Sequence, residues 1–416
     1  MRICILFKKL INYEQHVIKQ KMDISTLLDR GTVEVVVRED LEKKLKSGKK
    51  LRIKFGIDPT GSDLHIGHAV VLKKMREFQD AGHQVILLIG DYTAKIGDPT
   101  GRTETRKVLT DEKIKENMKS YTDQAGLILD MKNIEVRYNS EWLGKLQMAE
   151  LLQLASLKTV AQLSHRSDFK KRMKENIDIS LSEFLYPIMQ GYDSVVLKSD
   201  VELGGTEQTF NMLVGRDLQK HYGQPRQDVM TLPILEGLDG VEKMSKSYNN
   251  YIGLTEKASE MYGKTMSLPD SMIIKYFELT TNVPLEEIKK IKDQIEQGEN
   301  PKNLKMRLAK EIVTLYHNEN AATQAEKEFE QIFKDKGLPE EIELKKLKGN
   351  KWNIVELIAE TGLSPSKSET RRMIQGGGVK IDGEKIESHE DEIDISKERL
   401  VQVGKRKFVK VISSAQ

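Results

Sequence analysis

The sequence predicts an α/β protein with a parallel sheet, followed by a helical region and a small α+β region. Three observations predict this order. Residues 51–89 read as strand, loop, helix and strand, residues 255–333 show only helical periodicity, and residues 351–416 combine an amphipathic helix with short strand patterns. A chain of 416 residues has room for two or three domains. We therefore expect domains over residues 22–254, 255–333 and 351–416, a Lys-, Glu-, Gly- and Pro-rich linker over 334–350, and an N-terminal extension or tail over 1–21.

The first strand-to-strand unit carries the clearest pattern. Residues 51–55 alternate apolar and charged side chains, and residues 65–81 carry apolar side chains at helical spacing before Gly82, which suits a helix C-cap. The continuous apolar run 85–89 suits a buried parallel strand. Such a unit has a right-handed crossover, and ligands bind at the carboxyl ends of its strands. We expect the loop of residues 56–64 to lie at that edge.

Further elements follow from the same periodicities. We expect a strand at residues 134–138 and helices at 111–129 and 206–220. In the helical region, Asn300 is a capping residue and Pro301 suits the first helical position, which together are typical of a helix start.

Composition excludes several classes of protein. The 67 Lys and Arg residues against 64 Asp and Glu leave a net charge of +3, so net charge alone indicates no nucleic-acid partner. The single cysteine, Cys4, can form neither an internal disulfide nor a thiolate cluster, which favours a reducing cytoplasm. No compact apolar run approaches the roughly 20 residues that span a bilayer, and the apolar start is too short for a secretion signal. Met22 is an alternative natural start of the chain.

The first candidate constellation is the tetrapeptide His-Ile-Gly-His of residues 65–68, at the start of the first predicted helix. His65 and His68 lie on one face of a helical turn, and Gly67 lets a ligand approach the backbone. A helix N-terminus also supplies free N–H groups and a partial positive charge, which favour phosphate. These residues could hold a nucleoside triphosphate, and a metal-binding pair or a structural cap is the alternative.

The second constellation is the pentapeptide Lys-Met-Ser-Lys-Ser of residues 243–247. Lys243 and Lys246 lie in a predicted flexible loop, so they can close on a polyphosphate and neutralise the charge that develops on a leaving pyrophosphate. Taken alone, such a charge run is typical of a solvated surface. Its position after the first tetrapeptide favours the functional interpretation.

The two motifs resemble the HIGH and KMSKS signatures of class I aminoacyl-tRNA synthetases. The finer similarity is to the tyrosyl-tRNA synthetase family, and it covers the chain from about residue 23 to the C-terminal end. It rests on the motifs Asp58-Pro59-Thr60, Gly97-Asp98-Pro99, Tyr186-x-x-x-Gln190-x-x-Asp193 and Gly204-Gly205-Thr206-Glu207-Gln208. The resemblance implies a Rossmann-type catalytic domain that activates tyrosine with ATP, releases pyrophosphate and transfers tyrosine to the terminal adenosine of tRNA(Tyr).

The resemblance also implies roles for individual residues. Tyr186, Gln190 and Asp193 are spaced i, i+4 and i+7, so a helix would present them on one face, although an ordinary half-buried face is the alternative. Asp193 would accept from the phenol hydroxyl of tyrosine. The tyrosine-binding residues would be Asp98, Tyr186, Gln190, Asp193 and Gln208. The catalytic residues would be Thr60, His65, His68, Arg102, Arg106, Lys243 and Lys246. The ATP-binding residues would be Asp58, Gly67, Gly205, Glu207, Lys243, Met244, Ser245, Lys246 and Ser247.

Two residues depart from the family pattern. Lys54 stands where many members carry a tyrosine that donates to the substrate hydroxyl, so recognition of that hydroxyl would depend on Asp193 with different neighbours. Glu207 stands where the family commonly has an aspartate that contacts the ATP ribose, so its longer side chain would shift or reach through water. Neither departure touches the phosphate-binding residues.

The C-terminal region resembles the alpha-L RNA-binding domain. Residues 366–375 predict an amphipathic helix with adjacent arginines, and a glycine run, a short strand and a turn follow. The candidate RNA contacts are Arg371, Arg372, Lys405, Arg406 and Lys407. A predicted helix between the two signatures carries Lys170, Lys171, Arg172 and Lys174. For that helix, a solvated face and a contact with the tRNA acceptor arm both stay open.

The implied partners are tRNA(Tyr), L-tyrosine and ATP with Mg, the last as a substrate and not as a tightly bound cofactor. We expect no other metal site and no membrane contact, and the family implies a cytoplasmic homodimer. Tryptophanyl-tRNA synthetase shares the class I core, but it typically lacks the C-terminal RNA domain. The second alternative is an RNA-binding or splicing-associated protein that keeps the fold without aminoacylation, against which the intact HIGH and KMSKS motifs argue.

Overall fold

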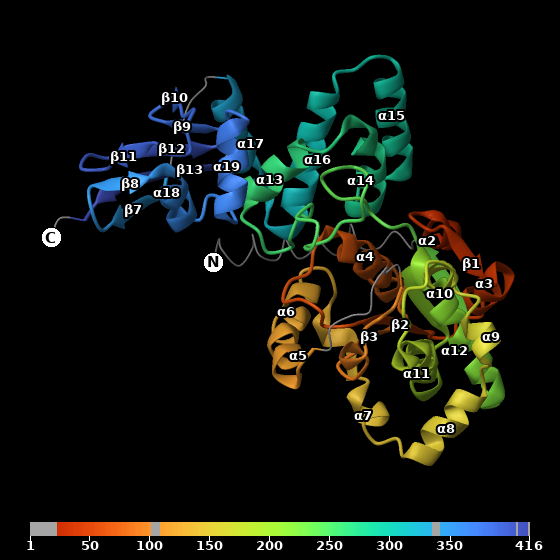
Figure 1. The fold of residues 1–416 in the computed structure, drawn as a ribbon. Coiled ribbons are helices and arrows are strands. Elements are labelled where there is room, and N and C mark those ends of the chain that lie inside the picture. Colours follow the sequence, from red (N-terminus) through yellow and green to blue (C-terminus); the bar gives the residue numbers. More distant parts are fainter. Residues whose placement is uncertain (1–22, 101–108, 335–341, 405–406, 415–416) are drawn as a thin grey trace, which may run out of the picture. The chain divides into compact units, whose positions relative to one another are not determined.

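The computed structural model describes residues 23–100, 109–334, 342–404 and 407–414 (Figure 1). The chain divides into two compact units, with the boundary between Glu319 and Asn320. The first unit contains the large sheet and most of the helices, and the second contains the small C-terminal sheets. No helix in the described part of the chain combines the length and the apolar character needed to cross a bilayer.

A six-stranded sheet forms the centre of the first unit. Its strands are β1 (Glu34–Val36), β2 (Arg52–Ile57), β3 (Gln84–Ile89), β4 (Ile134–Tyr138), β5 (Val201–Gly205) and β6 (Asp228–Leu232), in the order β1-β6-β5-β2-β3-β4. All neighbouring pairs are parallel except β1 and β6. The predicted parallel sheet is therefore confirmed. The apolar run of β3 is buried along residues 85–89 because the sheet is covered on both faces.

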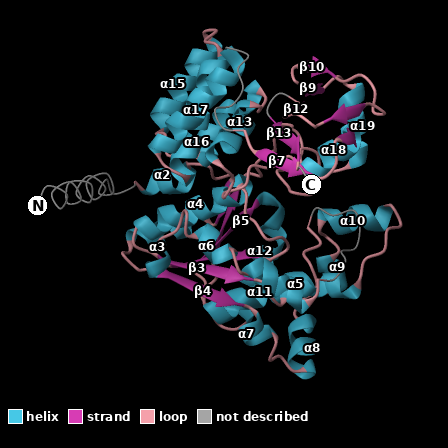
Figure 2. Ribbon diagram, turned by 90° about the vertical axis from the view of Figure 1, so that its left-hand side faces the viewer, coloured by secondary structure: helices cyan, strands magenta, loops and turns pink. Residues whose placement is uncertain are grey.

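Helices cover the two faces of this sheet. Helix α4 (Ile66–Asp80) packs against β2, β3 and β5. On the other face, Ile86 and Leu88 of β3 pack against α7 (Ser140–Leu143) and α11 (Leu181–Leu197). Figures 1 and 2 show α4 and α11 on opposite sides of the strands. Helix α12 (Thr209–His221) packs along α11.

Shorter helices complete this part of the unit. They are α2 (Ile24–Asp29), α3 (Arg38–Lys46), α5 (Asp111–Met118), α6 (Tyr121–Ala125), α8 (Met148–Ser156), α9 (Val160–Leu163) and α10 (Ser167–Lys174). The prediction of a single helix over residues 111–129 is wrong, because the chain turns between α5 and α6. The helix expected at 206–220 is confirmed, but it opens with a 3-10 turn over Thr206–Gln208.

The helical region follows the sheet within the same compact unit. Its helices are α13 (Ala258–Met266), α14 (Ile273–Thr280), α15 (Leu285–Glu296) and α16 (Pro301–Tyr316), with no strand among residues 258–316. The predicted start of α16 is confirmed, since the Asn300 side chain accepts a hydrogen bond from the Lys302 N–H at 3.0 Å. Helix α17 (Glu319–Lys334) spans the boundary between the units. The division into domains at residues 254 and 333 stays a prediction.

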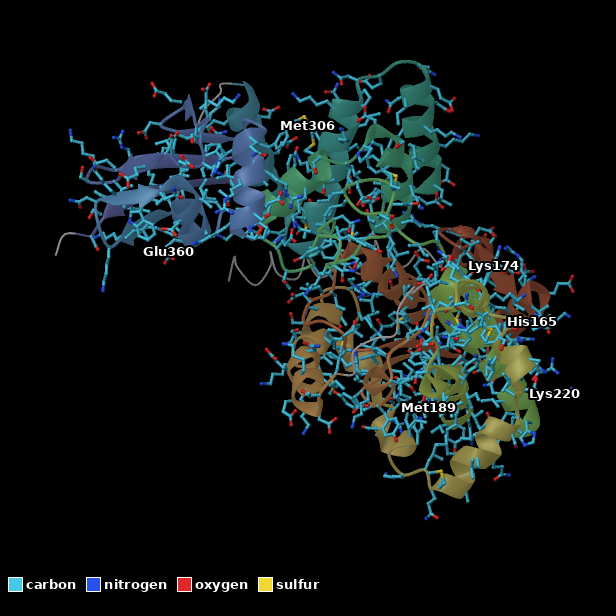
Figure 3. All side chains as sticks on the ribbon, viewed as in Figure 1. His165, Lys174, Met189, Lys220, Met306 and Glu360 are labelled. Atoms are coloured by element: carbon cyan, nitrogen blue, oxygen red, sulfur yellow. The ribbon has the colours of Figure 1, made fainter. Side chains whose placement is uncertain are left out.

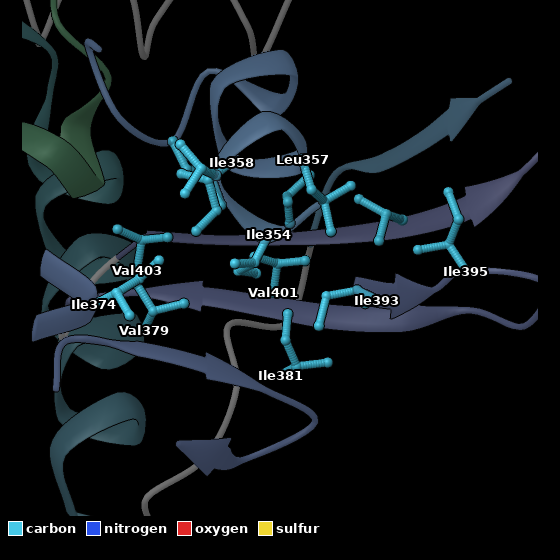
Figure 4. Packing of buried hydrophobic residues seen from close by; sticks show 14 of the residues in the cluster. Ile354, Leu357, Ile358, Ile374, Val379, Ile381, Ile393, Ile395, Val401 and Val403 are labelled. Carbon is cyan, nitrogen blue, oxygen red and sulfur yellow. The ribbon is translucent and has the colours of Figure 1, made fainter. Parts of the chain in front are cut away.

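The second unit contains α18 (Ile354–Thr361) and α19 (Lys367–Gln375) beside two small sheets. The larger sheet has the order β10 (Glu384–Lys385), β9 (Val379–Ile381), β12 (Arg399–Val403), β13 (Lys407–Ser413) and β7 (Leu344–Leu347). The smaller sheet pairs β11 (Glu392–Asp394) with β8 (Lys351–Asn353). Figure 4 shows how Ile354, Ile358 and Val401 join helix and sheet in one core. Strand β7 lies within the segment that was expected to be a linker, and it pairs with β13. The prediction missed this strand because its lysines interrupt the apolar pattern by which a strand is recognised.

Candidate active site

A cavity of about 450 Å³ lies at the carboxyl ends of the parallel strands. Strand β2 lies between β3 and β5. The chain adds β3 and β4 on one side of β2 and then β5 and β6 on the other side. In doubly wound sheets this switch in strand order opens a crevice for ligands. The cavity is lined by residues of β2, α4, α11 and β5 and by residues 243–247. The loop of residues 56–64 lies at this edge, as predicted.

The cavity brings together the described residues that the sequence assigned to tyrosine and ATP. Those that line it are Asp58, Thr60, His65, Gly67, His68, Asp98, Tyr186, Gln190, Asp193, Gly205, Glu207, Gln208, Lys243, Met244, Ser245, Lys246 and Ser247. Arg102 and Arg106 lie outside the described residues. Their assignment as phosphate contacts stays a prediction.

The His-Ile-Gly-His tetrapeptide starts α4 as expected. His65 is the N-cap residue in an extended conformation, and its N–H donates to Nδ1 of His68 at 3.2 Å. A side chain at Gly67 would place its Cβ 2.9 Å from Nδ1 of His65, so this close approach requires glycine. Nδ1 of His65 has no hydrogen-bond partner among the residues that the structure describes.

Both histidines are uncharged near neutral pH. Burial, aided by the charge of Lys246, lowers the pKa of His68 to about 4. Burial also holds the pKa of His65 far below its ordinary value, with His68 and Lys246 adding to the effect. The two rings are tilted by 37° to each other, with centroids 3.9 Å apart. The two side chains can therefore exchange hydrogen bonds with phosphate oxygens without supplying positive charge.

Backbone hydrogen bonds join the start of α4 to the chain that follows residues 243–247. The Ile66 N–H donates to the Ile252 carbonyl at 2.9 Å, and the Leu254 N–H donates to the Leu64 carbonyl at 3.1 Å. These bonds hold the chain that follows residues 243–247 beside the start of α4, and both segments line the cavity. The positive charge for a polyphosphate therefore comes from this loop and not from the histidines.

Within the loop, Lys243 is exposed and Lys246 forms an ion pair with Asp63. The hydrogen bond from Lys246 lowers the pKa of Asp63, so that carboxyl is ionised at neutral pH. Asn250 fastens the loop, because its Oδ1 accepts from the Ser245 N–H at 2.8 Å and its Nδ2 donates to the Lys243 carbonyl at 3.2 Å. The lysines thus sit on an anchored loop.

Asp193 on α11 is a buried carboxylate of the cavity, 2% exposed. Its Oδ1 accepts from Nε1 of Trp142 at 2.8 Å, and its Oδ2 accepts from Nδ2 of Asn139 at 3.3 Å. Burial raises the pKa of Asp193 to about 7, although the nearby charge of Lys54 opposes the shift. Sequence reasoning missed Asn139 and Trp142. Their place directly after a predicted strand was the available signal.

Lys54 on β2 is fully buried beside Asp193. Its ammonium group donates to Oε1 of Glu202 at 2.9 Å, to Oγ of Ser194 at 2.8 Å and to the Gln190 carbonyl at 3.2 Å. An ammonium group has three N–H donors, and each has an acceptor here. Lys54 therefore neutralises Glu202, and it does not replace the hydroxyl donor that the family pattern places at this position.

The three residues predicted to share a helix face do so. Tyr186, Gln190 and Asp193 all line the cavity from α11, which confirms the i, i+4, i+7 pattern. The Tyr186 hydroxyl donates to Oδ2 of Asp58 at 2.9 Å. A side chain at Gly90 would place its Cβ 2.0 Å from Oδ1 of Asp58, so a glycine is needed beneath this carboxylate.

A second carboxylate, Asp98, lies near Gln190 and Gln208. Its Oδ2 accepts from Nε2 of Gln208 at 2.5 Å, and its Oδ1 accepts from the N–H and Oγ1 of Thr100 at 2.9 and 2.6 Å. Asn211, which the sequence did not single out, donates to Oε1 of Gln190 at 2.9 Å and to Oε1 of Gln208 at 3.2 Å. This end of the cavity therefore presents oriented acceptors that suit an ammonium group.

The remaining predicted residues lie farther from the deep end of the cavity. Glu207 is exposed at the rim, where a Cβ on Gly205 would come within 2.3 Å of its Oε2. Among the described residues, no group of three or more His, Cys, Asp or Glu side chains is placed to hold a metal ion. Arg371, Arg372 and Lys407 are exposed in the second unit, whereas Lys405 and Arg406 lie outside the described residues.

Helix α10 carries the cations that the sequence placed between the two signatures. Lys170, Lys171 and Lys174 are exposed, and Figure 3 labels Lys174 at the end of this helix. Arg172 differs, since it is 1% exposed and its Nη1 lies 2.5 Å from Oε2 of Glu183. The prediction that Arg172 belongs to an exposed cationic group is therefore wrong.

The chain matches two family models. The model described as "tRNA synthetases class I (W and Y)" matches residues 46–334, and the model described as "Tyrosine--tRNA ligase SYY-like C-terminal domain" matches residues 328–411. Among curated proteins, the chain is 50% identical over 390 residues to the tyrosine–tRNA ligase of Moorella thermoacetica, covering 92% of this chain and 94% of that one. It is also 50% identical over 386 residues to the tyrosine–tRNA ligase of Thermotoga maritima, covering 92% and 96%.

Solved structures share the fold. A C-terminally truncated mitochondrial tyrosyl-tRNA synthetase of Aspergillus nidulans aligns with a TM-score of 0.64 and 24% identity, covering 78% of this chain and 99% of that one. A tyrosyl-tRNA synthetase of Archaeoglobus fulgidus, solved with L-tyrosine, aligns with a TM-score of 0.59 and 23% identity, covering 74% and 99%. At these identities the structures support the fold alone.

Proposed function

We propose that the cavity holds tyrosine at its deep end and ATP between α4 and residues 243–247, because the chain belongs to the class I tyrosine–tRNA ligases. The enzyme activates tyrosine with ATP to tyrosyl-adenylate and then transfers tyrosine to tRNA. Side chains of the cavity would carry the activation step, and exposed cations elsewhere on the chain would contact the tRNA.

One observation carries the placement of tyrosine. Asp193 is a buried carboxylate whose two neighbouring donors, Trp142 and Asn139, leave acceptor capacity for a hydroxyl group. Phenylalanine would leave that acceptor unpaired in a buried site, a penalty for which this enzyme family is the known example. Asp193 therefore favours tyrosine over phenylalanine.

The other end of the substrate meets the acceptors around Asp98. The α-ammonium group would donate to Asp98, Tyr186 and Gln190, and the α-carboxylate would lie near Gln208. In the first step a carboxylate oxygen attacks the α-phosphorus of ATP, a new O–P bond forms, and the bond to the bridging oxygen breaks to release pyrophosphate. A carboxylate is already a nucleophile, so the first step needs positioning and electrostatics and no general base.

Side chains at the phosphate end of the cavity would supply the electrostatic stabilisation for this step. Thr60 and His65 would hydrogen-bond the γ-phosphate of ATP, and His68 would lie near the ribose. Lys243 and Lys246 would neutralise the charge on the leaving pyrophosphate. Lys246 would exchange its partner Asp63 for phosphate when ATP binds. Mg bound to ATP supplies further neutralisation of the phosphates, and we infer that it arrives with the substrate.

The second step requires tRNA. A ribose hydroxyl of the terminal adenosine attacks the tyrosyl carbonyl carbon, and AMP leaves. We infer that tRNA(Tyr) is the acceptor and that exposed cations contact its phosphates. These cations are Lys170, Lys171, Lys174, Arg371, Arg372 and Lys407.

The family also supports a cytoplasmic homodimer. Met148 and Leu152 stand one turn apart on α8 and are 71% and 63% exposed, so they offer an apolar surface to a second copy. Sedimentation of the purified chain tests this assembly. A monomer at micromolar concentration would argue against it.

Pyrophosphate exchange into ATP tests the proposed substrate. Exchange is measured with tyrosine, with tryptophan and without an amino acid. Exchange that depends on tyrosine supports the proposal. Exchange that depends on tryptophan would assign the other class I specificity, and absence of exchange would indicate a protein without aminoacylation activity.

A further inference from the structure

Arg166, at the N-cap of α10, is a buried cation that the proposed mechanism does not use. The residue is 4% exposed, and it is not among the described residues that line the cavity. Its Nε and Nη2 donate to the two carboxylate oxygens of Asp168 at 3.1 and 2.8 Å. The guanidinium carbon lies 5.0 and 5.7 Å from the ring centroids of Phe169 and Phe210. Its position is therefore fixed from several sides.

Two further hydrogen bonds of Arg166 lead to the tyrosine site. Nη1 donates to Oδ1 of Asn211 at 2.6 Å, and Nη2 donates to Oγ1 of Thr100 at 2.9 Å. Asn211 in turn donates to Gln190 and Gln208, and Thr100 donates to Asp98. Arg166 is thus one residue removed from three of the proposed tyrosine-binding side chains.

The chemistry of the groups at the two ends sets the direction of every hydrogen bond between them. An arginine only donates, and an ionised carboxylate only accepts. Asn211 must therefore turn its oxygen to Arg166 and its NH₂ group to Gln190 and Gln208. The two glutamines then donate to carboxylates, with Gln190 Nε2 3.3 Å from Glu202 and Gln208 Nε2 2.5 Å from Asp98.

Without the guanidinium group this direction is no longer imposed. Asn211 is 1% exposed, so its oxygen would lose a charged donor and would have no access to bulk water. If its amide turned over, its oxygen would face the oxygens of Gln190 and Gln208. Each glutamine would then have to turn an oxygen toward a carboxylate to compensate. The acceptors for the ammonium group would no longer have a single arrangement.

We propose that Arg166 is a positioning residue for the α-amino group of tyrosine, because its bonds to Thr100 and Asn211 orient Asp98, Gln190 and Gln208. The inference rests on the proposed function, in which this end of the cavity binds that amino group. It assigns no role to Arg166 at the phenol end or at the phosphates.

The test compares ligands that carry or lack the amino group. Arg166→Met and Arg166→Lys are prepared with Arg226→Met, which removes an exposed arginine near the end of α12, as the matched control. Inhibition constants are measured for tyrosinol, which has the amino and phenol groups, and for 4-ethylphenol, which has the phenol group but neither an amino group nor a carboxylate. KM values for tyrosine and ATP are measured by pyrophosphate exchange.

For Arg166→Met we expect tyrosinol binding and the tyrosine KM to weaken by about tenfold or more, the size of effect expected for an unpaired buried acceptor. The inhibition constant of 4-ethylphenol and the KM of ATP should change by less than about twofold, because neither ligand contacts Asp98, Gln190 or Gln208. Arg166→Lys retains a cationic donor and should recover part of the loss. Arg226→Met should match the unchanged protein.

Equal weakening of tyrosinol and 4-ethylphenol would overturn the inference, because it would show a general structural role for Arg166. Unchanged tyrosinol binding would overturn it as well. If Arg166→Met fails to fold, Thr100→Val decides, because it removes only the link to Asp98. That variant should weaken tyrosinol selectively, and equal effects on both ligands would contradict the inference. An unchanged protein without tyrosine-dependent exchange would instead refute the proposed function.

Discussion

At the deep end of the cavity the polar side chains are held by one another, whereas at the phosphate end several face the open cavity. Asp193 and Lys54 are 2% and 0% exposed and have partners within hydrogen-bond distance. By contrast, Thr60, Lys243 and Ser247 are exposed. The side chains of the deep end are therefore already oriented before a ligand binds, whereas those of the phosphate end are still exposed to solvent.

The difference follows from the chemistry that each end has to recognise. A small neutral ring with one hydroxyl group offers little binding energy, so discrimination requires acceptors that are already oriented and already desolvated. A triphosphate carries several charges, so flexible cations can give up water or a temporary partner such as Asp63 and still gain. Changes at the deep end should therefore alter specificity or folding, and changes at the phosphate end should alter rate.

The largest effect should come from Asp193→Asn. An asparagine would turn an NH₂ group toward the donors Trp142 and Asn139 or toward the substrate hydroxyl, so kcat/KM for tyrosine should fall on the order of 10³-fold. The preference for tyrosine over phenylalanine should fall with it. Pyrophosphate exchange with both amino acids measures the two quantities.

Asp217→Asn is the matched control, because that carboxylate is exposed on α12 and pairs only with Lys158 among the described residues. It should leave both quantities unchanged. A loss below tenfold in Asp193→Asn, with the preference for tyrosine retained, would show that another group recognises the hydroxyl.

Lys54→Met should have the next largest effect, on stability. It leaves the carboxylate of Glu202 buried without its cation, so the free energy of unfolding should fall by about 3 to 5 kcal/mol. The double variant Lys54→Met, Glu202→Gln should recover much of this loss, because no charge is then left uncompensated. Urea unfolding measures both changes.

An ion pair at the surface gives the clearest comparison with the buried pair of Lys54 and Glu202. Lys49→Met removes the partner of Asp200 at the surface, where an ion pair contributes at most about 1 kcal/mol. If Lys54→Met proved no more destabilising than Lys49→Met, the buried network would not be holding the deep end in place.

Lys246→Ala should slow the activation step by about 10²-fold, because one charge-stabilising donor to the leaving group is lost. The dissociation constant of tyrosine should change by less than about twofold, since Lys246 lies at the phosphate end. Single-turnover kinetics and equilibrium dialysis measure the two quantities, with the exposed Lys257→Ala as the control. Equal losses in rate and in tyrosine affinity would contradict the separation of the two ends.

The smallest effect should come from pH. With a pKa of about 7, Asp193 becomes protonated as the pH falls through neutrality and then accepts a hydrogen bond less well. The tyrosine dissociation constant should rise by about tenfold from pH 8 to pH 6, as expected for one ionisation. Lys54 and Glu202 face Asp193 from β2 and β5 as an ion pair. Tyr186 shares the helix of Asp193, and burial raises its pKa well above the ordinary value, so it stays uncharged over that range.

Asp193→Asn supplies the contrast for the pH experiment. Binding to that variant should be weak at both pH values, with no slope between them. The histidines of the cavity have pKa values well below 6, so they add no slope either. A slope that survived in Asp193→Asn would assign the titration to another group.

The sequence by itself determined the parallel sheet, the start of α4 and most residues of the cavity. These features depend on local patterns. The alternation in β2, the apolar run of β3 and the i, i+4, i+7 spacing on α11 each lie within a short stretch of chain, and so do the two signature motifs. The same reasoning failed where local composition was ambiguous, as in the turn between α5 and α6 and in strand β7.

Only the tertiary structure decided which polar residues act together. Lys54 pairs with Glu202 across 148 positions of sequence, and Asn139 donates to Asp193 across 54. The sequence does not distinguish Arg172 from its exposed lysine neighbours, but in the structure it pairs with Glu183. In the same way, only the structure shows that Arg166 begins a hydrogen-bond network toward Asp98. A buried donor or acceptor takes its role from the partner that the fold brings within about 3 Å, and no local pattern specifies that partner.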